Sequence, residues 1–254
     1  MLELEIDNSV KSGHPTYPNP TIQEAVIEVH FERSEEKVWS AANFATYFEK
    51  VRADYPLLEP VQQVGFQMLV GPQGVSQQMV PAEQRMKYTH KSNQFLIQLS
   101  DRLFVQNVLP KYPGWQVVKK AVDINWNACI DTVGDCKLRR IGMRYINRVP
   151  KSSPTEKPRV WFKPNDNVAT AALDSLAPVF SRVETKTNNS NITVVTLAEG
   201  DNAFILDIDR VLLCSDSIKA TELMPSLEIL HDDVWAVFKS TCGDKLEGFL
   251  NQKS

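Results

Sequence analysis

The sequence predicts an α+β protein in two related halves, each a mainly antiparallel sheet covered by amphipathic helices. Its 254 residues are 43% hydrophobic and 23% charged, with a formal net charge of -3, which is ordinary for a globular protein with a sizeable core. Short segments of alternating apolar and polar residues, separated by turn residues, are typical of antiparallel strands. Two helical stripes of apolar residues, each following a pair of such segments, predict helices that cover the sheets.

The chain begins with a predicted proline-rich arm over residues 1–20. Pro15, Pro18 and Pro20 exclude a helix and favour an extended conformation. An extended arm can dock on its own sheet or on a second copy of the chain, so the sequence leaves a homodimer open. Residues 22–31 then alternate apolar and polar side chains, which predicts a half-exposed strand.

The first half, residues 21–136, continues with a predicted helix over 44–55 that Pro56 ends. The next segments have strand character, and they are 61–70, 86–90, 94–99 and 103–108. Pro113 suits the first turn of a second helix. The apolar stripe of that helix consists of Trp115, Val118, Val122, Trp126, Cys129 and Val133.

The second half, residues 137–254, opens with a predicted strand over 138–149, followed by a polar loop. Further strands are predicted at 160–162, 182–186, 192–197 and 203–213, before a last helix that starts at Pro225. Aligning Pro113 with Pro225 matches the apolar stripes of the two helices, which favours a duplication. The halves would then form two units or one compact domain. The alternative is that any amphipathic helix after a hairpin aligns in this way.

The strand over 138–149 carries the most informative charges in the sequence. Alternation places Arg140, Arg144 and Arg148 on one face, at a spacing of about 7 Å. The guanidinium group binds carboxylates and phosphates with two parallel hydrogen bonds. The three arginines are therefore predicted to bind a protein partner or an anionic ligand.

Internal ion pairing is the alternative for these arginines. Glu24 and Glu28 project from one predicted strand, and Asp207 and Asp209 project from another. If these strands flank the arginine strand, their carboxylates form cross-strand ion pairs with it. We therefore include Glu24 and Glu28 in the predicted binding surface and also consider them candidate internal partners.

The local motifs of enzymes are absent from the sequence. It contains no phosphate-binding glycine loop, no nucleophile elbow and no zinc motif, and its four cysteines form no C-x-x-C pair. Glu24, Glu28 and His30 form a candidate acid/base cluster without a nucleophile, so a hydrolase is a third and weaker hypothesis. His231 is predicted to be a boundary histidine held by its neighbour Asp232. No catalytic residue, metal ligand or cofactor is predicted.

The compartment and the remaining partner classes follow from composition. The N-terminus lacks a secretory signal and no apolar run is long enough to span a membrane, so a cytoplasmic protein without a membrane partner is expected. An acidic net charge disfavours nucleic acid, although a cationic strand with a few aromatic neighbours leaves a single-stranded ligand open.

Several segments together resemble a sporadically distributed family of bacterial proteins of about this length, whose activity is unknown. They are the sequence Tyr-Pro-Asn-Pro at 17–20, the strand that contains Glu24 and Glu28, Tyr-Pro-Gly-Trp at 112–115, and Arg-Ile-Gly-Met-Arg-Tyr-Ile-Asn-Arg at 140–148. The resemblance implies a bacterial protein with a role beside a toxin, a nuclease or a phage-response partner. It also implies that the arm, with Tyr17 and Asn19, and the arginine strand form a shared surface.

Two functional hypotheses follow. The first is a non-catalytic interaction protein, a component of a phage-defence or toxin–antitoxin-like system, that binds a protein partner through its basic strand face. The second is a sensor that binds a small anion or a nucleotide between the two halves, with the arginines on the phosphate.

Overall fold

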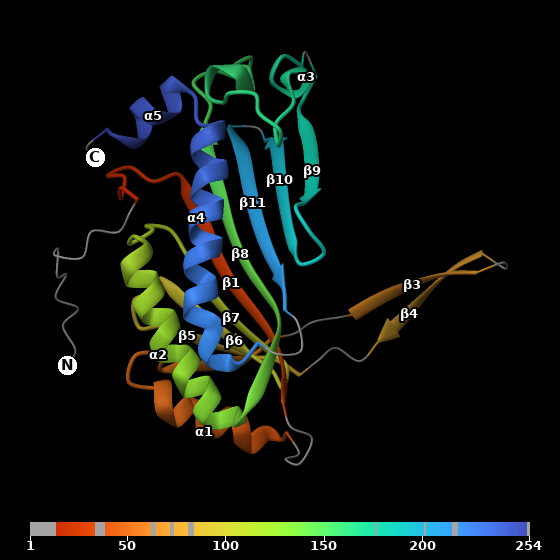
Figure 1. Ribbon diagram of the computed structural model, residues 1–254, viewed down its shortest axis with the longest axis vertical. Helices are drawn as coiled ribbons and strands as arrows, with labels where there is room; N and C mark the ends of the chain where they lie inside the picture. Colours follow the sequence, from red (N-terminus) through yellow and green to blue (C-terminus); the bar gives the residue numbers. More distant parts are fainter. Residues whose placement is uncertain are drawn as a thin grey trace.

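A single nine-stranded antiparallel sheet organises the chain in the computed structural model (Figure 1). The structure describes residues 14–33, 39–61, 65–71, 74–80, 84–175, 177–200, 202–214 and 218–252. In spatial order, the strands of the sheet are β2 (Leu57–Pro60), β5 (Met86–Thr89), β6 (Phe95–Leu99), β7 (Leu103–Val108), β1 (Ile22–Arg33), β8 (Cys136–Pro150), β11 (Ala203–Leu213), β10 (Asn191–Glu199) and β9 (Phe180–Lys186). A separate hairpin, β3 (Gly65–Gly71) and β4 (Gly74–Val80), projects away from this sheet (Figure 1).

Helices cover one face of the sheet. They are α1 (Ala41–Val51), α2 (Trp115–Val133), α4 (Leu223–Thr241) and the short α3 (Thr170–Leu173) and α5 (Asp244–Leu250), with two 3-10 turns, η1 (Pro158–Val160) and η2 (Ala220–Glu222). Their apolar sides join the inward side chains of the strands in one continuous core. We call the opposite face of the sheet, which carries the arginines of β8, the outer face.

The two predicted halves share this one sheet. β1 pairs with β8 in antiparallel register from Ile22 opposite Asn147 to Arg33 opposite Cys136. Both strands are long. If each half formed its own sheet, both would be edge strands with a row of unpaired backbone N–H and C=O groups, and their pairing provides hydrogen bonds for both rows. The prediction of a sheet in each half is therefore corrected to a single sheet, and the α+β class is confirmed.

Most predicted elements appear with shifted ends, and one does not appear. The segment 160–162 was predicted to be a strand, but the chain forms the 3-10 turn η1 from Pro158 to Val160. Proline has no N–H for a strand ladder and suits the first position of a helical turn. The predicted strand 61–70 lies partly outside the described residues; Val61 is described but lies outside the strands, and residues 65–70 belong to β3.

The alternation predicted for β8 is confirmed. Met143, Tyr145 and Asn147 are buried under the helices, whereas Arg144 and Arg148 are exposed on the outer face. Within the described part of the chain, no helix has the length and the apolar composition needed to cross a membrane.

Candidate functional site

A partly open pocket lies on the helix-covered side of the sheet, where the arm meets α2, α4, β8 and β11. Its open space, including solvent at the mouth, is about 730 Å³, and concave, largely apolar hollows of this kind are common binding places for small molecules. A third of the described residues that line it are aromatic, and these side chains are Tyr17, Tyr112, Trp115, Tyr145, Trp235 and Phe238. Because α2 belongs to the first half and α4 to the second, this arm pocket lies between the two halves.

The described part of the arm, residues 14–20, closes one side of the pocket by docking on helices of its own chain. The backbone N–H of Asn19 donates to the carbonyl oxygen of Leu250 at 3.1 Å, and its side-chain amide donates to the carbonyl oxygen of Phe249 at 3.2 Å. These two carbonyls belong to the last turn of α5, where the i+4 helical partners run out, and the carbonyl of Phe249 also accepts the backbone N–H of Gln252 at 3.2 Å. The ring of Tyr17 stacks on Trp235, with 5.8 Å between ring centroids. Tyr17 and Asn19 therefore contribute to the pocket, as part of the arm.

His231 is a buried polar side chain in the wall of the pocket. Its ring lies parallel to Trp115, with 4.4 Å between centroids and 7° between planes, and only 8% of the residue is exposed. Within the described residues, its ring nitrogens make no hydrogen bond. Burial, together with the nearby His14 imidazole, lowers the pKa of His231 to about 4. The imidazole is therefore neutral at pH 7 and can use a nitrogen lone pair toward the pocket.

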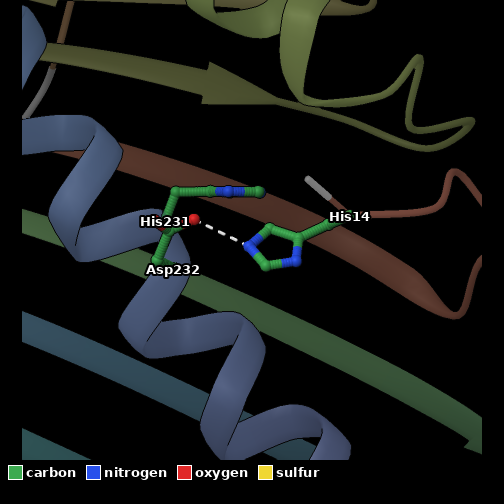
Figure 2. Close-up of side chains that lie close together, drawn as sticks. All are labelled: His14, His231 and Asp232. Atoms are coloured by element: carbon green, nitrogen blue, oxygen red, sulfur yellow. Dashed lines mark hydrogen bonds and ion pairs between the residues drawn. The ribbon is translucent and has the colours of Figure 1, made fainter. Parts of the chain in front are cut away.

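His14 and Asp232 approach His231 at the edge of the pocket (Figure 2). His14 Nε2 and Asp232 Oδ1 are 2.7 Å apart, and the His14 ring stacks on Trp235 with 4.8 Å between centroids. One ligand atom from each of His14, His231 and Asp232 lies within 4.8 Å of the other two. The arm and α4 are more than 200 positions apart in sequence, so the spacing of histidines could not reveal this cluster.

The prediction that Asp232 holds His231 is corrected by this geometry. The carboxylate of Asp232 forms its hydrogen bond with His14 of the arm. Successive residues of a helix point about 100° apart, which directs Asp232 to the helix surface and His231 toward the core.

Uncharged hydrogen-bonding groups form the floor of the pocket. The hydroxyls of Tyr112 and Tyr145 are 2.9 Å apart, and the Thr21 hydroxyl donates to Asn147 Oδ1 at 3.0 Å. Burial raises the pKa of both Tyr112 and Tyr145 above the usual range. Both phenols therefore stay protonated at neutral pH, and since one hydroxyl donates to the other, the pair offers one O–H donor and oxygen lone pairs to a ligand.

The predicted arginine surface lies on the outer face, across the sheet from the pocket. Arg144 donates two hydrogen bonds to Asp207, at 2.8 and 2.6 Å, and Arg140 forms an ion pair with Glu28. Asp207 lies on β11 and Glu28 on β1, the two strands that flank β8. These two arginines therefore form the internal cross-strand pairs that the sequence left open as an alternative.

Arg148 differs from these two arginines. It is exposed, and among the described residues its side chain has neither a hydrogen bond nor an ion pair. Register places it opposite Ile205 of β11, which lies opposite Ala198 of β10, which lies opposite Phe180 of β9. Phe180 is 76% exposed. An unpaired cation and an exposed aromatic ring therefore lie in one row across the outer face.

The three residues of the candidate acid/base cluster, Glu24, Glu28 and His30, do not all lie together. His30 Nε2 lies 2.8 Å from Glu28 Oε1, whereas Glu24 accepts a hydrogen bond from Asn107 Nδ2 at 2.8 Å. Four strand positions separate Glu24 from Glu28, about 13 Å, which is too far for them to act on one bond. The hydrogen bond from His30, opposed by burial and aided by the Arg140 charge, lowers the pKa of Glu28 to about 2. Glu28 is therefore a permanently ionised partner at neutral pH and no general acid.

No protein-family model matches this chain, and no curated protein matches its sequence.

Proposed function

We propose that the protein is a sensor that binds a small, uncharged, ring-containing molecule in the arm pocket between its two halves. The observation that supports this most is the unpartnered ring of His231 in the aromatic part of the wall of the arm pocket. Aromatic walls favour a flat ligand that stacks or packs edge-to-face against them. His231 and the hydroxyls of Tyr112 and Tyr145 would then fix its orientation by hydrogen bonds.

This proposal changes the ligand class expected from the sequence. Among the described residues that line the pocket, histidines are the only ones with a titratable nitrogen, and arginine and lysine are absent. The arginines of β8 point to the other face of the sheet and cannot reach a ligand in the pocket. A phosphate would therefore find no strong cation there, and an uncharged heterocycle fits better.

The test is native mass spectrometry of the gently purified protein, followed by thermal-shift titration with the released molecule or with a panel of heterocycles. Replacing His231 by phenylalanine keeps the ring on Trp115 but removes both nitrogens. We expect the affinity to fall about tenfold, the cost of one hydrogen bond to a buried group. The matched control is His90→Phe, outside the pocket, with unchanged affinity. Equal binding by the wild type and His231→Phe would contradict the proposal.

We also propose that the two halves are related by duplication. From the pair at the centre of the sheet, the strand order β1-β7-β6-β5 on one side corresponds to β8-β11-β10-β9 on the other. The long helices α2 and α4 follow β7 and β11 and cover the same face. This correspondence supports the proposal, and it would make the arm pocket a site at the junction of two similar units.

A second candidate function is partner binding by the outer face, the role expected from the resemblance to a bacterial family with defence-associated partners. It is favoured by the row that joins Arg148 to the exposed ring of Phe180. Arginine and aromatic side chains are typical anchors of protein interfaces. The partner surface would present a carboxylate and an apolar side chain separated by three strand spacings, about 14 Å.

Arg148→Glu tests this candidate. We expect a folded variant that no longer retains the protein that co-purifies with the wild type at low salt, since a reversed charge at an anchor is repulsive. Arg52→Glu, on the helix-covered side, is the control and should retain the partner. Retention of the partner by Arg148→Glu would exclude the outer face as its site.

A further inference from the structure

We infer that His14, His231 and Asp232 form a binding site for a divalent transition-metal ion of the Zn²⁺ type, which joins the arm to helix α4. The site goes beyond the proposed function, because a metal ion can bind there whether or not the pocket holds an organic ligand.

The first argument is the ligand set and its geometry. The three ligand atoms lie within 4.8 Å of one another, and the closest pair, His14 Nε2 and Asp232 Oδ1, is 2.7 Å apart. In a tetrahedral zinc site, bonds of about 2.0 to 2.2 Å place neighbouring ligand atoms about 3.3 Å apart. Rotation of the exposed Asp232 side chain, with a smaller adjustment of the half-buried His14 ring, would bring the observed distances to this value. Two imidazoles with one carboxylate favour Zn²⁺ and its neighbours over Mg²⁺ or Ca²⁺.

The second argument is independent of that distance. His231 is 8% exposed, lines the pocket, and makes no hydrogen bond within the described residues. The ring nitrogens of His231 are not among the fully buried unpartnered atoms of the described residues, so they reach the open space of the pocket and are available to a ligand. Coordination of a metal ion by one ring nitrogen would provide a partner, and the adjacent His14 and Asp232 would complete the site.

The third argument is that both imidazole planes are already held. His231 lies parallel to Trp115 at 4.4 Å, and His14 stacks on Trp235 at 4.8 Å. Groups around metal ligands commonly fix their orientation, and this lowers the cost of ordering them on binding. Aromatic stacking has that role at this site.

Two consequences follow from three protein ligands. A tetrahedral ion would keep one position for water or for a donor atom of a molecule in the pocket, since His14 and His231 both line it. The ion would also link two chain segments that are more than 200 residues apart, so it would stabilise the docked arm.

The test uses the full-length, untagged protein after treatment with a chelator. Co²⁺ is titrated while the visible absorption is recorded, and Zn²⁺ is then added in competition. We expect one Co²⁺ per chain, the absorption of a four-coordinate ion, and its loss when Zn²⁺ replaces it. His14→Ala and Asp232→Asn, both at exposed or half-exposed positions, should each weaken binding about tenfold or more.

His90→Ala and Asp123→Asn are the matched controls, a histidine and an aspartate outside the cluster, and they should bind Co²⁺ as the wild type does. The inference is overturned if the wild type binds no stoichiometric Co²⁺, or if His14→Ala and Asp232→Asn bind it with unchanged affinity. Co²⁺ binding with no heterocycle bound would support the metal site and count against the pocket ligand, so the two proposals fail separately.

Discussion

Replacing Trp126 by alanine is expected to lower the free energy of unfolding by about 3 to 5 kcal/mol, the range for removing a large aromatic side chain from a core. Trp126 is 2% exposed, and its ring packs edge-on against Phe31 and Phe104, with centroids 5.8 and 5.5 Å away. Its indole N–H donates to the carbonyl oxygen of Ala220 at 3.0 Å. The substitution would leave a cavity and also a carbonyl without its donor.

The hydrogen bond gives Trp126 a role in joining the two halves. Trp126 lies on α2, whereas Ala220 belongs to η2, which leads directly into α4. Urea unfolding followed by circular dichroism measures the loss. Trp126→Phe keeps most of the ring volume and should cost less than the alanine variant. A loss below about 2 kcal/mol for Trp126→Ala would show that the site collapses around the cavity or was never tightly packed.

Periodicity predicted the parts of the fold that depend on neighbours in sequence. Every member of the predicted apolar stripe of α2, from Trp115 to Val133, is buried. Likewise, alternation assigned Arg144 and Tyr145 to opposite faces of β8. In both cases the rule needs only the local geometry of a helix or a strand.

Local periodicity could not predict contacts between segments that are distant in sequence. The pairing of β1 with β8 merges the halves into one sheet and brings Glu28 to Arg140 and Asp207 to Arg144. The sequence suggested such ion pairs but could not decide between internal pairing and an exposed binding surface, because the order of strands in a sheet depends on tertiary structure. The candidate metal cluster is the clearest case, since no local spacing relates His14 to residues of α4.

The backbone of Gly243, which joins α4 to α5, lies close to the backbone of Trp161, and Gly243→Ala should therefore have the second large effect. A Cβ atom at Gly243 would lie 2.7 Å from the carbonyl oxygen and 2.9 Å from the carbonyl carbon of Trp161. The Gly243 N–H donates to that same oxygen at 2.8 Å. With φ at -86°, alanine fits the dihedral angle, so the penalty is steric and comes from backbone atoms that cannot rotate away.

We expect Gly243→Ala to cost about 1 to 3 kcal/mol of stability, as overpacking does, and to weaken Co²⁺ binding at the site that includes His14 of the arm. The reason is that α5 would shift away from Trp161, and Leu250 at its end lines the pocket and accepts the backbone N–H of Asn19. Gly248→Ala is the matched control, because an added Cβ there meets nothing within 4 Å. Alanine in α5 should raise the free energy of unfolding by about 0.5 to 1 kcal/mol. Thermal unfolding and Co²⁺ titration of both variants measure the two effects. If Gly243→Ala matched Gly248→Ala in stability and in binding, the docking of α5 would not position the arm, and the pocket would have to be maintained by α4 and the sheet alone.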